Sequence, residues 1–211
     1  FSATASKLTL VSNDIVLHNV VLISSIDAVV NVLNVSGADV MLSDIEYRED
    51  TQVQCTDCII SSATATRFKV RGFKYRPFDA TAGTVAGIAL IGIESADISE
   101  LDVIGLWSAG FVDCRTTAST NLQVYNVRYR SLGTGEILVK DTVTGSTGMI
   151  GPNIYARLSA NTTNITEVVS GATFVVMGGT STAGIGGNTF LVANLANEQG
   201  MAVNWTNSTD A

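Results

Sequence analysis

The chain has 211 residues, of which 46% are hydrophobic and only 15% are charged, and this composition excludes a disordered chain. Its formal net charge of −7 argues against a protein that wraps nucleic acid, because that function depends on neutralising phosphates with basic residues. The length is sufficient for one domain with a substantial core, and the frequent Val, Ile, Thr and Ser favour strands.

A short apolar phrase recurs along the chain, and its first copy is 15–22. Apolar residues follow one another there at spacings of two, three and two, with Asn19 at the break, and 40–47, 68–75 and 122–129 repeat the pattern. A flat strand would keep a spacing of two, so we predict a sharp corner at each break, in residue types that tolerate a left-handed backbone. The predicted corner residues are Asn19, Asp44, Gly72, Asp102, Asn126, Asn153 and Asn194.

The spacing of these corners predicts a solenoid. Successive corners lie roughly 24 to 30 positions apart through Asn153, a period typical of solenoids, and about 41 apart from there to Asn194. Each coil has a single apolar edge that only a neighbouring coil, stacked about 4.8 Å away, can bury. We predict an all-β parallel solenoid of six to seven coils in 1–197, with a C-terminal cap or tail in 198–211. A β-sandwich is the alternative fold.

The repeated phrase, Ile-x-Leu/Val-x-x-Asn/Asp-Val/Ile, resembles the coils of the right-handed parallel β-helix in the pectin-lyase-like superfamily. The resemblance covers about residues 8 to 197. Phage tailspikes and fibres use such coils, so the resemblance implies a trimeric structural component of a virus particle (a spike, fibre or head decoration) that also binds a glycan or a receptor. Its expected partners are further copies of itself and other virion proteins, in the virion or on an extracellular surface. The alternatives are a glycan depolymerase, either hydrolase or lyase, and a bacterial surface adhesin.

Acidic residues on the coils are the candidates for catalysis, because enzymes that hydrolyse polysaccharides use paired carboxylates. Glu100 falls where the repeat expects an apolar residue, so it is either a buried acid or the mark of a local bulge, and Asp102 and Asp113 complete the set. Alternatively, Asp102 is only a corner residue and Glu100 points outward. The His-Gly and Arg-Ile-Lys segments of pectinase-type hydrolases are missing, which favours a protein that is not an enzyme.

The segment 67–76 holds five of the twelve basic residues, and alternation turns them outward. Together with Arg128 and Arg130, they favour a basic stripe that binds an acidic glycan or the carboxylates of a partner. The alternative is a ladder of weak ion pairs with acids on neighbouring coils, namely Glu46, Glu49, Asp50 and Glu94. The predicted binding residues are Arg67, Lys69, Arg71, Lys74, Arg76, Arg128 and Arg130.

Ile104, Leu106 and Trp107 fall at outward or turn positions, and clustered exposed apolar side chains favour a contact between subunits of a homotrimer. Alternatively, a loop covers them, or Trp107 and Trp205 stack on sugar rings.

Cys55 and Cys58 resemble half of a metal-binding knuckle, but no second pair follows and His18 is the only histidine. We therefore expect all three cysteines, Cys114 included, to be small buried side chains, and we expect neither a metal nor a cofactor. Polar residues interrupt the most apolar stretch, 15–33, so no membrane span is expected. The sequence opens at Phe1 rather than Met, which indicates a fragment or a processed product.

Overall fold

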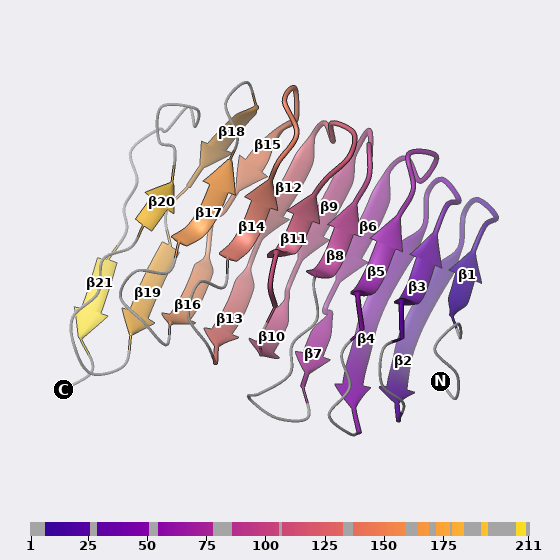
Figure 1. The fold of residues 1–211 in the computed structure, drawn as a ribbon, viewed down its shortest axis with the longest axis horizontal. Coiled ribbons are helices and arrows are strands. Elements are labelled where there is room, and N and C mark those ends of the chain that lie inside the picture. The colour runs from indigo at the N-terminus through magenta and orange to yellow at the C-terminus, as the bar shows by residue number, and fades with distance from the viewer. Residues whose placement is uncertain are drawn as a thin grey trace.

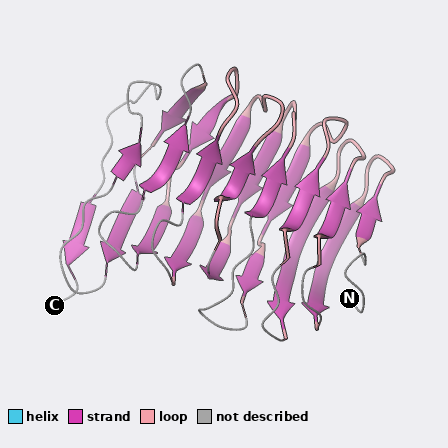
Figure 2. Cartoon of the chain, in the orientation of Figure 1, coloured by secondary structure: helices cyan, strands magenta, loops and turns pink. Residues whose placement is uncertain are grey.

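The computed structural model of this chain describes residues 7–25, 29–50, 55–77, 86–105, 107–132, 137–158, 164–168, 172–177, 179–183, 191–193 and 206–209. Every regular element within these ranges is a β-strand (Figure 2). They contain no helix of the length and apolar character that crossing a bilayer requires.

The strands stack side by side into two long parallel sheets that face each other along the molecule (Figure 1). An eight-stranded sheet has the order β1-β3-β5-β8-β11-β14-β17-β20. Its strands are β1 (Leu8–Leu10), β3 (Asn31–Val35), β5 (Asp57–Ser61), β8 (Ala86–Leu90), β11 (Gly110–Cys114), β14 (Ile137–Asp141), β17 (Asn164–Val168) and β20 (Leu191–Ala193).

A thirteen-stranded sheet forms the rest of each coil, with the order β18-β15-β12-β9-β6-β4-β7-β10-β13-β16-β19-β21 and β2 paired to β4. Its strands are β2 (Val16–Ser24), β4 (Met41–Glu49), β6 (Phe68–Arg71), β7 (Lys74–Arg76), β9 (Ala96–Ser99), β10 (Asp102–Gly105), β12 (Leu122–Tyr125), β13 (Val127–Ser131), β15 (Thr147–Ile150), β16 (Ile154–Leu158), β18 (Thr173–Val176), β19 (Gly179–Ala183) and β21 (Thr206–Thr209).

The predicted parallel β-solenoid is confirmed, and its eight-stranded sheet takes one strand from each successive coil. Much of 159–211 is outside the described residues, but the strands described within this range continue both sheets. Within the segment predicted as a cap or tail, β21 continues the stack by pairing in parallel with β19.

The thirteen-stranded sheet bends at a corner inside each coil. β2 and β4 run through the bend, whereas later coils divide there into two strands, such as β6 and β7 or β12 and β13. The residues at the bend have left-handed backbones, with φ of +55° at Asn19, +54° at Asp44, +71° at Gly72, +53° at Asn126 and +62° at Asn153. A left-handed residue reverses the alternation of the strand, so the side chains before and after it point to the same interior.

The corner predicted at Asp102 is wrong. Asp102 begins β10, and the left-handed residue of this coil is Glu100, with φ +55°. The register of β9 with β12 pairs Ser99 with Tyr125, which sets Glu100 opposite Asn126. The apolar phrase of this coil reads Ala96, Ile98, Leu101 and Val103, and small Ala96 hid its true start. The last predicted corner, Asn194, lies outside the described residues.

Stacked apolar columns fill the space between the sheets. One column, contributed by the eight-stranded sheet, is completely buried and places like residues in register on successive coils. It runs through Leu33, Ile59, Ile88, Val112 and Val139. Each coil thus covers the apolar edge of the next, which is the main source of stability in a solenoid.

Candidate anion-binding surface

Two outward columns on the short strands after the corner carry an unusual concentration of arginine. β10, β13 and β16 lie side by side in the stack (Figure 1), and their alternate residues Val103, Tyr129 and Ala156 are buried. The residues between them therefore point away from the core. The outward columns read Asp102–Arg128–Tyr155 and Ile104–Arg130–Arg157.

The three arginines are exposed and form no ion pair with an acid among the described residues. The acid in register with Arg128 is Asp102, whose Oδ2 instead accepts a hydrogen bond from Nη2 of Arg76 at 2.6 Å. A depression of about 300 Å³ is lined by residues of both columns. Tyr155, 55% exposed, supplies an aromatic ring on this same surface. We call Arg128, Arg130, Arg157 and Tyr155 the arginine face.

The corner residues explain why these side chains share one face. Asn126 and Asn153 are both left-handed, so the strand that follows each restarts with the same alternation. Residues 126–130 and 153–157 are thus two copies of one pattern, in which the second and fourth residues after the corner point outward. Neighbouring strands lie about 4.8 Å apart, so Arg130 and Arg157 present adjacent guanidinium groups.

Sequence reasoning identified Arg128 and Arg130 but missed Arg157 and Tyr155. The sequence does contain a signal for Arg157. When 153–157 is aligned with 126–130, Arg157 takes the same position as Arg130. A dense run such as 67–76 marks a basic surface directly in the sequence, whereas this surface gathers its arginines from successive coils.

All three arginines predicted as part of a stripe in 67–76 are ion-paired. Arg67 pairs with Asp39 on the preceding coil, and this hydrogen-bonded pair lowers the pKa of Asp39. Nη2 of Arg71 lies 2.9 Å from Oε1 of Glu100, and Arg76 binds Asp102 as described above. The segment therefore fits the alternative interpretation, a ladder of ion pairs between neighbouring coils, although the acids differ from the ones predicted. Lys69 and Lys74 are exposed.

The structure does not bring the three candidate catalytic acids together. Glu100 is an exposed corner residue held by Arg71, and not a buried acid, while Asp102 is held by Arg76. Asp113 lies in the other sheet, on β11, and is only 4% exposed. Burial raises its pKa, and the nearby Arg115 opposes this rise. Asp102 lines the depression of the arginine face, whereas Glu100 lines a different one, and a glycoside-cleaving pair would need to share an opening.

The prediction that Trp107 lies outward is wrong, because it is 4% exposed. Its Nε1 donates a hydrogen bond to the carbonyl of Ile137 at 2.6 Å, and its ring packs edge-on against Phe111 with centroids 5.0 Å apart. The chain folds Trp107 back into the core, where the aromatic rings bury its large surface. Ile104 is half-buried beside the arginine face, and Leu106 lies outside the described residues.

Exposed apolar side chains gather instead at the N-terminal end of the solenoid. Val16, Val21 and Ile23 project from β2, the edge strand of its sheet, and Val11 and Val30 are exposed nearby. On the next coil, the positions of Val21 and Ile23 carry charged Glu46 and Arg48.

Buried acids accompany arginine in the eight-stranded sheet. Arg115 forms an ion pair with Asp57, two coils away, and its Nη1 lies 3.5 Å from Oδ2 of Asp113. Burial raises the pKa of Asp57, and the Arg115 charge opposes this rise. Arg115 thus occupies the space between the acids. The described residues contain no group of three or more His, Cys, Asp or Glu side chains that could hold a metal ion.

No protein-family model matches this chain, and comparison with curated proteins and with solved structures gives no significant match. The class of the protein therefore rests on its own fold, a parallel β-solenoid, and on the arginine face.

Proposed function

We propose that this chain is a structural β-solenoid module of a virus particle and that its arginine face binds an acidic glycan on a cell surface. The observation that carries the binding proposal is that three exposed arginines on one face have no acidic partner among the described residues. Guanidinium groups bind carboxylates and sulfates through two parallel hydrogen bonds, which makes arginine well suited to acidic sugars.

The geometry favours a linear ligand with repeated negative charges. Arg130 and Arg157 lie on adjacent strands about 4.8 Å apart, while Arg128 and Arg130 are two residues apart along one strand, at about 6.6 Å. The face is a shallow depression and not an enclosed cavity, so a chain can lie across it. Tyr155 offers a ring against which the apolar face of a sugar can pack.

The assignment to a virus particle is supported by the resemblance to the coils of phage spikes and fibres. We place the chain with the pectin-lyase-like β-helices on the same grounds. The proposal keeps the homotrimer and the extracellular location predicted from the sequence, but not the predicted contact through Trp107, because that side chain is buried.

The test measures binding of the purified chain to immobilised heparin, used as a sulfated glycan, with neutral dextran as the second surface. The variant Arg128→Gln/Arg130→Gln/Arg157→Gln is compared with Arg48→Gln/Arg67→Gln/Arg71→Gln, which removes the same charge from exposed arginines that have acidic partners. We expect the first variant to lose at least roughly 10-fold in affinity, which corresponds to about 1.4 kcal/mol. We expect the second to lose less than roughly 3-fold.

Equal losses of affinity in the two variants would show that only net charge matters, and would contradict specific binding by the arginine face. Binding to dextran as strong as binding to heparin would contradict the ligand class. The length of the glycan after incubation is measured as well, since shortening would support the depolymerase alternative over a binding module.

A further inference from the structure

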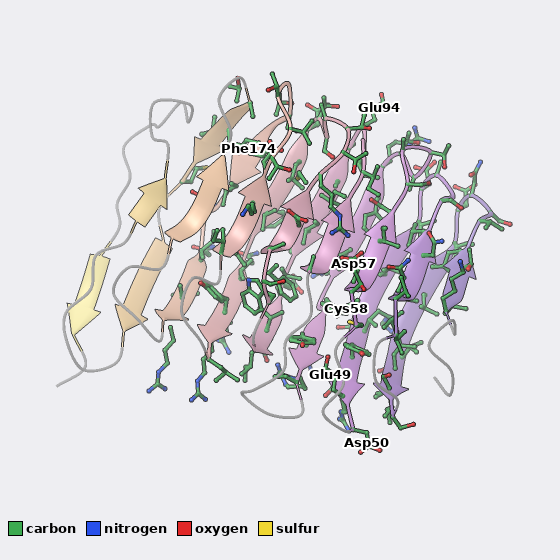
Figure 3. The ribbon with its side chains drawn as sticks, in the orientation of Figure 1. Glu49, Asp50, Asp57, Cys58, Glu94 and Phe174 are labelled. Carbon is green, nitrogen blue, oxygen red and sulfur yellow. The ribbon has the colours of Figure 1, made fainter. Side chains whose placement is uncertain are left out.

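Two of the three cysteines lie with their sulfur atoms in contact inside the solenoid. Sγ of Cys55 and Sγ of Cys58 are 3.4 Å apart, and each residue is 1% exposed. Cys58, which is labelled in Figure 3, is the second residue of β5, and Cys55 precedes that strand by two residues.

The backbone between the two cysteines is fixed to the preceding coil. The N–H of Thr56 donates to the carbonyl of Val29 at 2.9 Å, and the N–H of Asp57 donates to the carbonyl of Val30 at 3.0 Å. These bonds begin the pairing of β5 with β3, so the stacking of the coils holds the sulfur atoms together. Their contact is a property of the fold and not of a free loop.

Two buried tyrosines and a carboxylate surround the pair. The rings of Tyr47 and Tyr75 stack with centroids 6.0 Å apart, and the hydroxyl of Tyr75 donates to Oε1 of Glu49 at 3.2 Å. Burial raises the pKa of the Cys58 thiol well above its usual value, and the neighbouring Cys55 and Glu49 act in the same direction. The closed coil therefore keeps this thiol protonated and unreactive, so any reaction occurs during folding or local opening.

We propose that Cys55 and Cys58 form a reversible disulfide that fastens the start of β5 within its coil. A disulfide requires sulfur atoms about 2.05 Å apart, so the present contact must shorten by roughly 1.4 Å for the bond to form. Cys114, on β11, lies two strands away from β5 in the stack, about 9.6 Å, which is too far for it to join either sulfur. The proposal is independent of the glycan-binding function.

The oxidant is a small-molecule disulfide such as oxidised glutathione, of the kind present in oxidising compartments. The thiolate of one cysteine attacks this disulfide, forms a mixed disulfide and releases one glutathione thiolate. The thiolate of the other cysteine then attacks the protein sulfur of the mixed disulfide, which forms the Cys55–Cys58 bond and releases the second glutathione thiolate. The two protons lost by the cysteines pass to the two released thiolates, so the protein is oxidised and glutathione is reduced.

The test incubates the folded chain with oxidised or reduced glutathione, and also refolds it from denaturant in each, so that burial cannot hide the thiols. The protein is then denatured with excess N-ethylmaleimide, and its mass gives the number of thiols. We expect one modified thiol after oxidation and three after reduction, with a peptide map that joins Cys55 to Cys58. The Cys114→Ser variant should still form the bond, and Cys58→Ser should not.

Three free thiols after oxidative refolding would overturn the proposal, and so would a bond that includes Cys114. A stable mixed disulfide on Cys55 in the parent chain would overturn it as well, because the second exchange step would then fail. The thermal midpoint of the Cys114→Ser variant provides a second measurement, since the disulfide should raise it under oxidising conditions and a reductant should reverse the rise.

Discussion

The side chains of Asn126 and Asn153 join the corners of two neighbouring coils. Nδ2 of Asn153 donates a hydrogen bond to Oδ1 of Asn126 across 2.9 Å, and both residues have left-handed backbones. Each asparagine thus turns its own coil, and the pair also links that coil to the next. The repeated break in the sequence has this physical meaning, because few residue types provide both the conformation and the bond.

The Asn126→Val variant should unfold more easily than the parent. A β-branched residue resists the left-handed conformation, at a cost of about 1–2 kcal/mol, and the lost hydrogen bond to Asn153 adds about 1 kcal/mol. Denaturant titration measures the loss. Asn126→Gly is the control, since it keeps the conformation and should lose only the smaller part. A Val variant as stable as the parent would contradict the placement of this corner.

Glu100 is an unfavourable residue for its corner, so replacing it should stabilise the fold. Glu100→Asn should be more stable than Glu100→Gln by about 1 kcal/mol, because asparagine adopts the left-handed backbone more readily than glutamine. Both variants lose the ion pair with Arg71, so this comparison cancels that contribution. Equal thermal midpoints for the two variants would show that Glu100 carries no conformational strain.

Asp141 should make stability depend on pH in a predictable direction. It is 2% exposed, and its Oδ1 accepts hydrogen bonds from the N–H of Val143 at 2.9 Å and the hydroxyl of Ser146 at 3.3 Å. Burial raises its pKa above the usual 3.8, and the nearby Asp113 adds to the rise. The folded state therefore binds the carboxyl proton of Asp141 more tightly than the unfolded state does. The resulting stabilisation is complete below pH 3.8 and is lost as pH rises through the folded pKa.

The Asp141→Asn variant, which cannot ionise, should consequently be more stable than the parent at neutral pH, by about 1 kcal/mol. The difference should shrink toward pH 3.8 and below, where the parent carries a neutral carboxyl group. Asp57, whose pKa burial also raises, remains in both proteins and cancels in the comparison. Asp113 loses the repulsion of the Asp141 charge in the variant, which adds to the gain expected at neutral pH. Thermal midpoints across this range provide the measurement, and a difference that grows at low pH would contradict the prediction.

The periodic phrase was sufficient to predict the solenoid and most of its corners, because inward positions repeat on every coil. It misplaced the corner of one coil, where Ala96 is too small to mark the start of the apolar phrase and acidic residues occupy both 100 and 102. Local pattern also misplaced Trp107 at an outward position, because a residue between strands is buried only when the chain folds back over the aromatic core.

The arginine face was predictable only in part, for a similar reason. Arg128 and Arg130 stand in one strand, but their grouping with Arg157 depends on how the next coil stacks. Ion pairing depends on stacking too. The sequence therefore could not distinguish the ion-paired arginines of 67–76 from those of the arginine face, which have no acidic partner among the described residues.

The register that brings Arg130 beside Arg157 is the basis of both the fold and the proposed function, and a cross-link tests it directly. Paired residues on adjacent parallel strands lie about 4.8 Å apart, within the range that a disulfide spans. In a chain with Cys55, Cys58 and Cys114 changed to Ser, Arg130→Cys/Arg157→Cys should form an intramolecular disulfide readily under mild oxidation. The control Arg128→Cys/Arg157→Cys, which is out of register, should cross-link more slowly. A control pair that links as fast as the Arg130–Arg157 pair, or faster, would contradict the stacking on which the arginine face depends.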